Sequence, residues 1–179
     1  MGEAGCTDAR GEDGVSRAFV KEGDGEESSP ALRIPSLEVN YVTPRGLELL
    51  RQEVKALNAL RDQHQRQEDL ASQSVVREAE RDLAYYLDRL RSAVLVEATS
   101  NPKGQVRFGS TVRAIDESGE VYEVSLVGED EADVQKGLIS YVSPLAKALL
   151  KARVGDEVIW QRPLGEVRLE ILSVDGVVV

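Results

Sequence analysis

Cysteine, histidine and aromatic residues are scarce in this chain of 179 residues, of which only 4% are aromatic. Its one cysteine excludes an internal disulfide and a cysteine-based zinc site, and its one histidine excludes a histidine-rich metal site. The same scarcity disfavours a Ser-His-Asp mechanism. No apolar run approaches the roughly 18 residues of a membrane span, and no secretory apolar segment lies near the start. We therefore expect a cytoplasmic protein with no membrane partner.

Positive charge is also in short supply. The formal net charge is −10, with 22 Lys and Arg against 32 Asp and Glu. This balance disfavours generic binding to nucleic-acid phosphates, which needs a basic surface, and favours partners that are proteins or metal-bearing sites. Apolar residues make up 41% of the chain, which is enough for the core of one ordinary domain or of two small ones.

Residues 1–40 offer little to a folded core. They are rich in Gly, Glu, Asp and Ser, and they carry nine acids against four bases. Because so little apolar surface is available to offset the entropy of ordering, the composition predicts a disordered acidic tail.

Residues 41–97 have the spacing of two amphipathic helices. Thr43 suits the N-cap of the first helix and Pro44 its first position. Apolar residues then recur at intervals of three and four, as in a coiled coil. They are Leu47, Leu50, Val54 and Leu57, followed by Val76, Ala79, Leu83, Tyr86, Leu90 and Val94. The short polar stretch between the two sets predicts an antiparallel helical hairpin.

Residues 98–179 change to the alternating pattern of half-buried strands, over 106–116, 121–128 and 166–174. A turn is expected from Asp116 to Gly119. One helix is expected in "SPLAKALLKARVGDEV", with Ser143 as its cap, Pro144 as its first residue and Gly155 in the turn that follows. The residues expected to face a core are Leu145, Leu149 and Leu150. Strands with one packed helix predict a small α+β domain.

Four stretches, taken in order, resemble the Gre family of transcript cleavage and elongation factors. "YVTPRGLELLRQEV" (41–54) resembles the opening of the family's first hairpin helix, and "FGSTV" (108–112) its first strand after the hairpin. "LVGEDEAD" (126–133) resembles its second strand and acidic turn. "LISYVSPLAKALLKARVGDEVIW" (138–160) is similar to its C-terminal signature. The resemblance covers about residues 41–175, and the ordered combination makes it specific.

The resemblance implies a fold and a partner. The fold is α+β, with an N-terminal antiparallel helical hairpin (41–97) followed by an FK506-binding-protein-like antiparallel sheet domain with one helix (98–179). The implied protein is a monomeric bacterial factor, not an enzyme on its own, that binds RNA polymerase at the rim of the secondary channel. It meets nascent RNA and DNA only indirectly. In such factors, acids at the hairpin tip help the polymerase active site to hold Mg²⁺ for RNA cleavage; the factor has no cofactor of its own.

The tip departs from the family pattern. The resemblance implies an Asp-x-x-Glu-Asn arrangement, but this chain has Glu68 and Asp69, with Glu78 and Glu80 about ten residues later. Adjacent acids on a helix point about 100° apart, so Glu68 and Asp69 converge on one ion only if the bend is not helical. The hairpin is also shorter than in typical cleavage factors, with arms of at most about 35 Å.

Two functions therefore stay open. The first is a regulator of elongation with weak or no cleavage stimulation, in which Glu68 and Asp69 belong to a solvated turn. The second is a cleavage factor in which Glu68 and Asp69 are the catalytic tip acids and stimulate the nuclease activity of the polymerase. A more distant third is an interaction module that self-associates through its coiled coil.

The other polar residues near the tip are expected to be structural. His64 is interpreted as an exposed hydrophilic residue, and no metal ligand is assigned to the chain itself. The acids of the second helix are interpreted as surface partners of Arg77 and Arg81. They are Glu78, Glu80 and Asp82.

In the C-terminal domain, Ser143, Pro144, Gly155 and Asp156 are expected to act as a scaffold that keeps a polymerase-binding surface in shape. An isomerase activity, suggested by the fold analogy alone, has little support. Such a pocket needs an aromatic lining, and the aromatic residues are scattered along the sequence. They are Phe108, Tyr122, Tyr141 and Trp160, of which Tyr141 or Trp160 is expected in the core.

Overall fold

The computed structural model describes residues 36–67, 69–97 and 104–176. Residues 35–179 make one compact unit. Most of the predicted tail, residues 1–35, lies outside the described residues, but its last five residues, 36–40, are described. The Tyr141 hydroxyl donates a hydrogen bond to the carbonyl of Val39. Asn40 is buried, and its side-chain amide donates to the backbone carbonyl of Arg89 at 2.7 Å.

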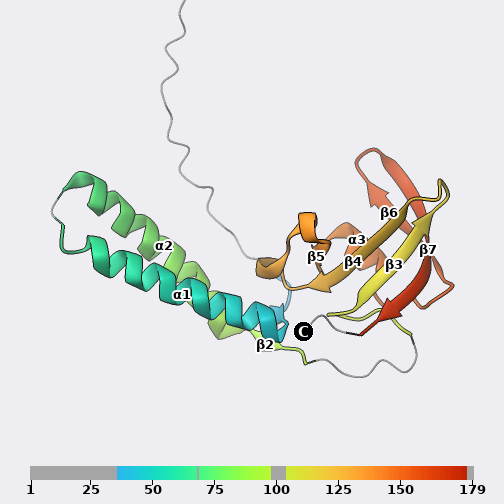
Figure 1. The fold of residues 1–179 in the computed structure, drawn as a ribbon, viewed down its shortest axis with the longest axis horizontal. Coiled ribbons are helices and arrows are strands. Elements are labelled where there is room, and N and C mark those ends of the chain that lie inside the picture. Colours follow the sequence, from blue (N-terminus) through green and yellow to red (C-terminus); the bar gives the residue numbers. More distant parts are fainter. Residues whose placement is uncertain (1–35, 68, 98–103, 177–179) are drawn as a thin grey trace, which may run out of the picture. The chain divides into compact units, whose positions relative to one another are not determined.

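The predicted hairpin is present. Helix α1 (Pro44–His64) and helix α2 (Leu70–Ser92) run side by side (Figure 1). As predicted, Thr43 is the N-cap of α1, where its hydroxyl accepts the N–H of Gly46 at 2.9 Å, and Pro44 opens the helix. The predicted seam holds the two helices together, and its most buried members are Leu50, Ala79 and Leu83.

The second helix ends earlier than predicted. Val94 fits the spacing of three and four, but Ala93 already has extended backbone angles, φ −61° and ψ 126°. Val94 belongs to strand β2 (Val94–Leu95), which pairs in parallel with β1 (Tyr41–Val42). The spacing predicts a helical residue here because Val94 follows Leu90 by four residues. Val94 also begins the apolar run Val94-Leu95-Val96, which is rich in β-branched residues and favours a strand.

The sheet domain has five strands in the order β5-β4-β3-β7-β6. Three of them correspond to the predicted strands: β3 (Thr111–Asp116), β4 (Val121–Val127) and β7 (Gly165–Asp175). The others are β5 (Leu138–Ser140) and β6 (Glu157–Arg162). The predicted turn from Asp116 to Gly119 is also present, with Gly119 at φ +88°. The predicted α+β fold is confirmed.

One strand pair corrects the expectation of an antiparallel sheet. Strand β5 runs parallel to β4, with Ser125 opposite Leu138. The connection between them contains two short 3₁₀ turns, η1 (Glu129–Glu131) and η2 (Val134–Lys136). These turns bring the chain back beside the second half of β4, so that β5 can add in the same direction.

Helix α3 (Pro144–Leu149) is shorter than its sequence pattern suggested. It packs against the sheet through Leu145, Ala146 and Leu149, with Leu150 partly buried beside them, as predicted. The chain leaves the helix through Lys151, whose φ of +74° ends the helical geometry. Tyr141 is buried, as expected. Among the described residues, no helix is long and apolar enough to cross a membrane.

Candidate functional site at the hairpin tip

The tip of the hairpin is the short polar link predicted between the two helices, and it lies between His64 and Leu70. Helix α1 continues to His64, and the N–H groups of Gln65 and Gln67 donate to the carbonyls of Arg61 at 2.8 Å and His64 at 3.0 Å. Helix α2 begins at Leu70, which is 82% exposed. Glu68, one of the two predicted tip acids, lies outside the described residues.

Asp69, the other predicted tip acid, is the N-cap of α2. Its Oδ1 accepts the N–H of Ser72 at 2.8 Å, and its carbonyl accepts the N–H of Gln73 at 3.1 Å. Hydrogen bonds from Ser72, first from its backbone and then from its side chain, hold the pKa of Asp69 below its ordinary value. Asp69 is therefore an ionised, exposed carboxylate with one oxygen committed to starting a helix.

Ser72 is the buried centre of the tip. Its hydroxyl donates to the Oε1 of Gln67 at 2.6 Å, and it lies 3.2 Å from Nδ1 of His64. Which of the two atoms donates in the contact between His64 and Ser72 depends on the tautomer of His64. His64 is therefore half-buried and hydrogen-bonded, which corrects the expectation of an exposed residue. The bonds around Ser72 join the end of α1 to the start of α2.

The acids farther along α2 lie on the helix surface. Arg81 and Asp82 form an ion pair at 3.3 Å, as predicted. Glu78 and Glu80 are exposed. Among the described residues, no group of three or more His, Cys, Asp or Glu side chains is placed to hold a metal ion. Among the described residues, the acid chemistry at the tip therefore centres on Asp69.

The predicted scaffold residues of the sheet domain have the expected local roles. Ser143 caps α3 by accepting the N–H of Ala146 at 3.2 Å, and Pro144 is the first residue of that helix. Asp156 accepts the N–H of Arg153 at 2.8 Å. Gly155, at φ +85°, allows the turn that leads into β6.

An apolar groove of about 620 Å³ lies beside Ser143 and Pro144. Its walls come from β4, η2, β5, α3 and β6, and they include Tyr122, Val134 and Trp160. The rings of Tyr122 and Trp160 meet edge to face at 5.9 Å. Partial burial and, to a smaller extent, the hydrogen bond to Glu120 raise the pKa of Tyr122 to about 12. The Tyr122 hydroxyl therefore stays protonated.

The aromatic residues of the domain are therefore not scattered in space, which corrects the sequence interpretation. Tyr122 and Trp160 meet in the groove, and a second group lies elsewhere. In that group, Phe108 and Tyr141 are 5.5 Å apart, and Tyr41 contacts both. Neither group could be predicted from the sequence, because the fold brings together residues that are far apart in the chain.

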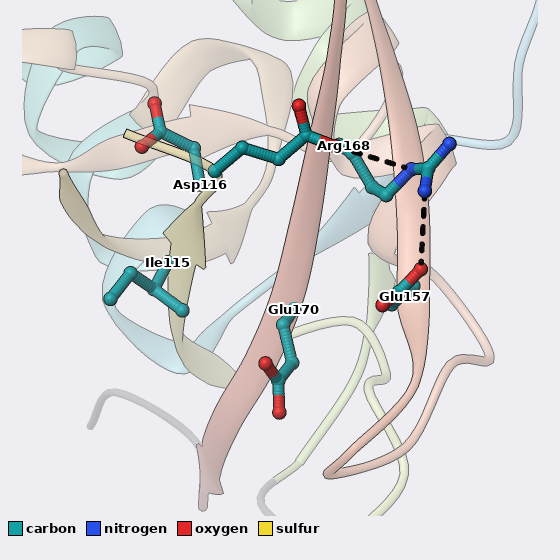
Figure 2. Close-up of a pocket in the computed structure, with 6 residues that line it drawn as sticks. Ile115, Asp116, Glu157, Arg168 and Glu170 are labelled. Carbon is teal, nitrogen blue, oxygen red and sulfur yellow. Dashed lines mark ion pairs between the residues drawn. The ribbon is translucent and has the colours of Figure 1, made fainter. Parts of the chain in front are cut away.

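A smaller, acid-lined pocket of about 140 Å³ lies on the sheet between β3, β6 and β7 (Figure 2). Arg168 is its only cation among the described lining residues, and it forms ion pairs with Glu117 at 3.7 Å and Glu157 at 3.8 Å. Figure 2 shows Arg168 directed toward Glu157, while the carboxylates of Asp116 and Glu170 are directed elsewhere. Since these carboxylates do not converge, the pocket is a weaker candidate than the tip.

Comparison with known proteins points to one family. The family model described as "Transcription elongation factor, GreA/GreB, C-term" matches residues 101–176. The chain is 36% identical over 152 residues to the transcription elongation factor GreB of Neisseria meningitidis serogroup B (strain ATCC BAA-335 / MC58), covering 76% of this chain and 93% of that protein. It is 38% identical over 124 residues to the transcription elongation factor GreA of Nautilia profundicola, covering 69% of this chain and 76% of that protein.

A comparison of structures finds the crystal structure of GreA factor homolog 1 (Gfh1) of Thermus thermophilus. The identity is 25% and the TM-score 0.38, with 78% of this chain and all of that chain covered.

Proposed function

Because the chain belongs to the GreA/GreB family of transcription elongation factors, we propose that it binds RNA polymerase at the rim of the secondary channel and regulates elongation with weak or no stimulation of transcript cleavage. In this proposal the factor is a cytoplasmic monomer without enzymatic activity of its own, and it meets RNA and DNA only through the polymerase. Its net charge of −10 suits this role, since the polymerase rather than the factor holds the nucleic acid.

The observation that carries the proposal is the position of Asp69 at the tip. A carboxylate that recruits Mg²⁺ must present its oxygens to the ion in a defined geometry. Oδ1 of Asp69 instead accepts the Ser72 N–H at 2.8 Å, so the side chain is turned toward its own helix. An acid that caps a helix in this way is poorly placed to share an ion with a second carboxylate.

The reach of the hairpin supports the same proposal. Helix α1 has 21 residues and α2 has 23, which correspond to about 32 and 35 Å. The alignment with the Neisseria GreB is 152 positions long. The aligned part of this chain is 76% of its 179 residues, which is fewer residues than the alignment has positions. That relative therefore carries residues without a counterpart in this chain, and we attribute them to a longer hairpin.

The apolar groove is our candidate for the polymerase-binding surface. Val134 on its wall is 82% exposed, and Tyr122 and Trp160 provide the aromatic surface that is typical of protein interfaces. Ser143 and Pro144 line the groove directly. Gly155 and Asp156 act at a distance, by shaping the turn into β6, the strand that carries Trp160.

An active cleavage factor is the alternative. The observation in its favour is that Asp69 is exposed and ionised at the tip of the hairpin. Glu68 and Asp69 would then be the catalytic acids and help the polymerase active site to hold Mg²⁺, whose charge would activate water for phosphodiester hydrolysis. Self-association through the hairpin is the third possibility, which sedimentation of the free chain as a monomer would exclude.

The test of cleavage uses stalled, backtracked elongation complexes. We expect the chain to leave the rate of RNA cleavage nearly unchanged and to slow the cleavage stimulated by an active GreB, by competing for the channel. Rapid cleavage that disappears in the Glu68→Ala/Asp69→Ala variant would establish the alternative. Asp69→Asn is the matched control, because Asn retains the capping oxygen and removes only the charge.

The test of docking changes exposed apolar residues. Val134→Asp places a charge on the wall of the groove, and we expect it to weaken binding to RNA polymerase by about tenfold or more. Leu164→Asp is the control, since Leu164 is 98% exposed and lies in the turn between β6 and β7, outside the groove. Equal affinities for the two variants would rule out the groove as the docking surface.

A further inference from the structure

A short acidic turn of the sheet domain, η1, contacts both helices at the base of the hairpin. The turn consists of the three acids of η1: Glu129 and Asp130 contact Arg89, and Glu131 contacts Thr43. We refer to these acids and their partners Thr43, Tyr85 and Arg89 as the junction cluster. Glu131 contacts the start of α1, and Asp130 contacts the last turns of α2, so a single turn reaches both helices.

The contact with α2 is a buried ion pair. Nε of Arg89 donates to Oδ2 of Asp130 at 2.6 Å, and the hydroxyl of Tyr85 donates to Oδ1 at 2.6 Å. Nη2 of Arg89 lies 3.8 Å from Glu129, and the Arg89 side chain is only 3% exposed. Both oxygens of Asp130 are therefore held, and two donors one helical turn apart fix the direction of its carboxylate.

The contact with α1 depends on a glycine. The hydroxyl of Thr43 donates to Oε2 of Glu131 at 2.6 Å while it accepts the N–H of Gly46. A Cβ atom at position 46 would lie 2.7 Å from that same Oε2. A side chain at position 46 would therefore displace the Glu131 carboxylate from its place at the positive end of the α1 dipole.

This arrangement is better suited to fixing geometry than to gaining stability. Burying charges is costly, and apolar groups of equal volume often stabilise a fold as well. Three buried atoms at this junction find no hydrogen-bond partner in the described part of the protein. They are Asn40 Oδ1, Arg89 Nη2 and Glu131 Oε1. Directional bonds to both helices nevertheless restrict how the hairpin can rotate against the sheet domain.

We propose that the junction cluster sets the direction of the hairpin, and that Arg89 and Asp130 are positioning residues for the action of the tip. This rests on the proposed function, in which the sheet domain docks and the tip acts. The α2 arm is about 35 Å long, so a rotation of about 2° at the base moves the tip by about 1 Å. Displacements of this size are enough to disturb an active site.

The experiment measures the direction of the hairpin without polymerase. Spin labels at Gln65→Cys in the tip and Glu166→Cys in the sheet domain, in a Cys6→Ser background, report the distance between the two regions by pulsed electron paramagnetic resonance. Asp130→Asn keeps the size of the side chain and removes its charge, and we expect it to broaden the distance distribution. The control is Asp82→Asn, which removes the charge of an aspartate paired with Arg81 on the surface of α2.

Tyr85→Phe keeps the test decisive if Asp130→Asn fails to fold, because it removes one hydrogen bond to Asp130 and leaves the ion pair in place. If Asp130→Asn folds and its distance distribution equals that of the wild type, the proposal is overturned. If Asp130→Asn does not fold, a wild-type distribution in Tyr85→Phe overturns it. On elongation complexes saturated with the factor, Asp130→Asn should weaken the effect of the factor on the elongation rate by about tenfold and change polymerase affinity by less than about threefold. Failure of the wild type to bind polymerase would sink the proposed function instead, and would leave the distance result intact.

Discussion

At the base of the hairpin, Asp130 is 13% exposed and bonded to Arg89 and Tyr85, whereas at the tip Asp69 is exposed and bonded to Ser72. The bonds have similar lengths, 2.6 Å at the base and 2.8 Å at the tip. Their surroundings differ, because water competes for the tip bond and is excluded from the base. A broken bond at the base leaves a buried charge, but a broken bond at the tip leaves a solvated one.

This difference indicates how the two ends divide their roles. The base holds the two helices and η1 in one geometry, and it does so with residues far apart in the sequence. The tip is built from neighbours within nine residues, from His64 to Ser72, so its structure can change without disturbing the rest of the hairpin. The chemistry of the tip can therefore change while the base keeps its geometry.

The largest effect should come from breaking the buried ion pair. Arg89→Met leaves Asp130 buried without its cation, and we expect a loss of about 3–5 kcal/mol in the free energy of unfolding. Urea denaturation followed by circular dichroism measures this loss. Arg81→Met is the matched control, since Arg81 pairs with Asp82 on the surface, and it should cost less than about 1 kcal/mol. Similar losses for both variants would contradict the contrast between buried and exposed pairs.

The contribution of apolar packing to stability should also decrease from the base of the hairpin to its tip. Leu50, in the part of α1 nearer the base, is 1% exposed, and Leu60, nearer the tip, is 38% exposed. Leu50→Ala should therefore cost about 3 kcal/mol, and Leu60→Ala less than about 1 kcal/mol. Equal destabilisation in thermal or urea unfolding would mean that the hairpin is packed uniformly along its length.

A smaller and local effect is expected from removing the cap at the tip. Asp69→Ala deprives the Ser72 N–H of its acceptor, so hydrogen exchange at the first amides of α2 should accelerate by about fivefold. Asp69→Asn should leave exchange nearly unchanged, because its side-chain oxygen accepts the same bond. Amides at the base of the hairpin serve as the internal reference and should keep their rates in both variants. Acceleration at the base as well would show that the two ends are coupled.

The sequence predicted what depends on local pattern. Thr43, Pro44, Ser143 and Pro144 were assigned correctly as helix starts because caps and first-turn prolines act within a few residues. The spacing of apolar residues also predicted the hairpin. It failed at Val94, which continues the spacing although the backbone has already left the helix at Ala93.

The junction cluster was missed because its partners lie 41 to 88 residues apart. No local pattern announces that Arg89 is buried, and its neighbour Leu90 had already been assigned to the seam. The cap at Asp69 was within reach of sequence reasoning, since aspartate is among the preferred N-cap residues. The adjacent acids instead suggest a pair of metal ligands, an interpretation that does not account for the cap. The parallel strand β5 has only three residues, too few for a periodic pattern.

The smallest effect expected is the pH dependence of the tip. A carboxylate whose pKa is lower in the folded chain than in the unfolded chain stabilises the fold above the unfolded value, about pH 4, and this stabilisation is lost as the pH falls through the folded value. Asp69 has such a lowered pKa because of its bonds from Ser72. The carboxyl ¹³C shift of Asp69 should therefore titrate below pH 4, together with a loss of protection at the Ser72 amide. In Asp69→Asn that amide should keep its protection as the pH falls.

Titration of Asp69 at or above pH 4 would mean that the cap is open in solution. The tip carboxylate would then be available to a metal ion, and this result would favour the cleavage alternative.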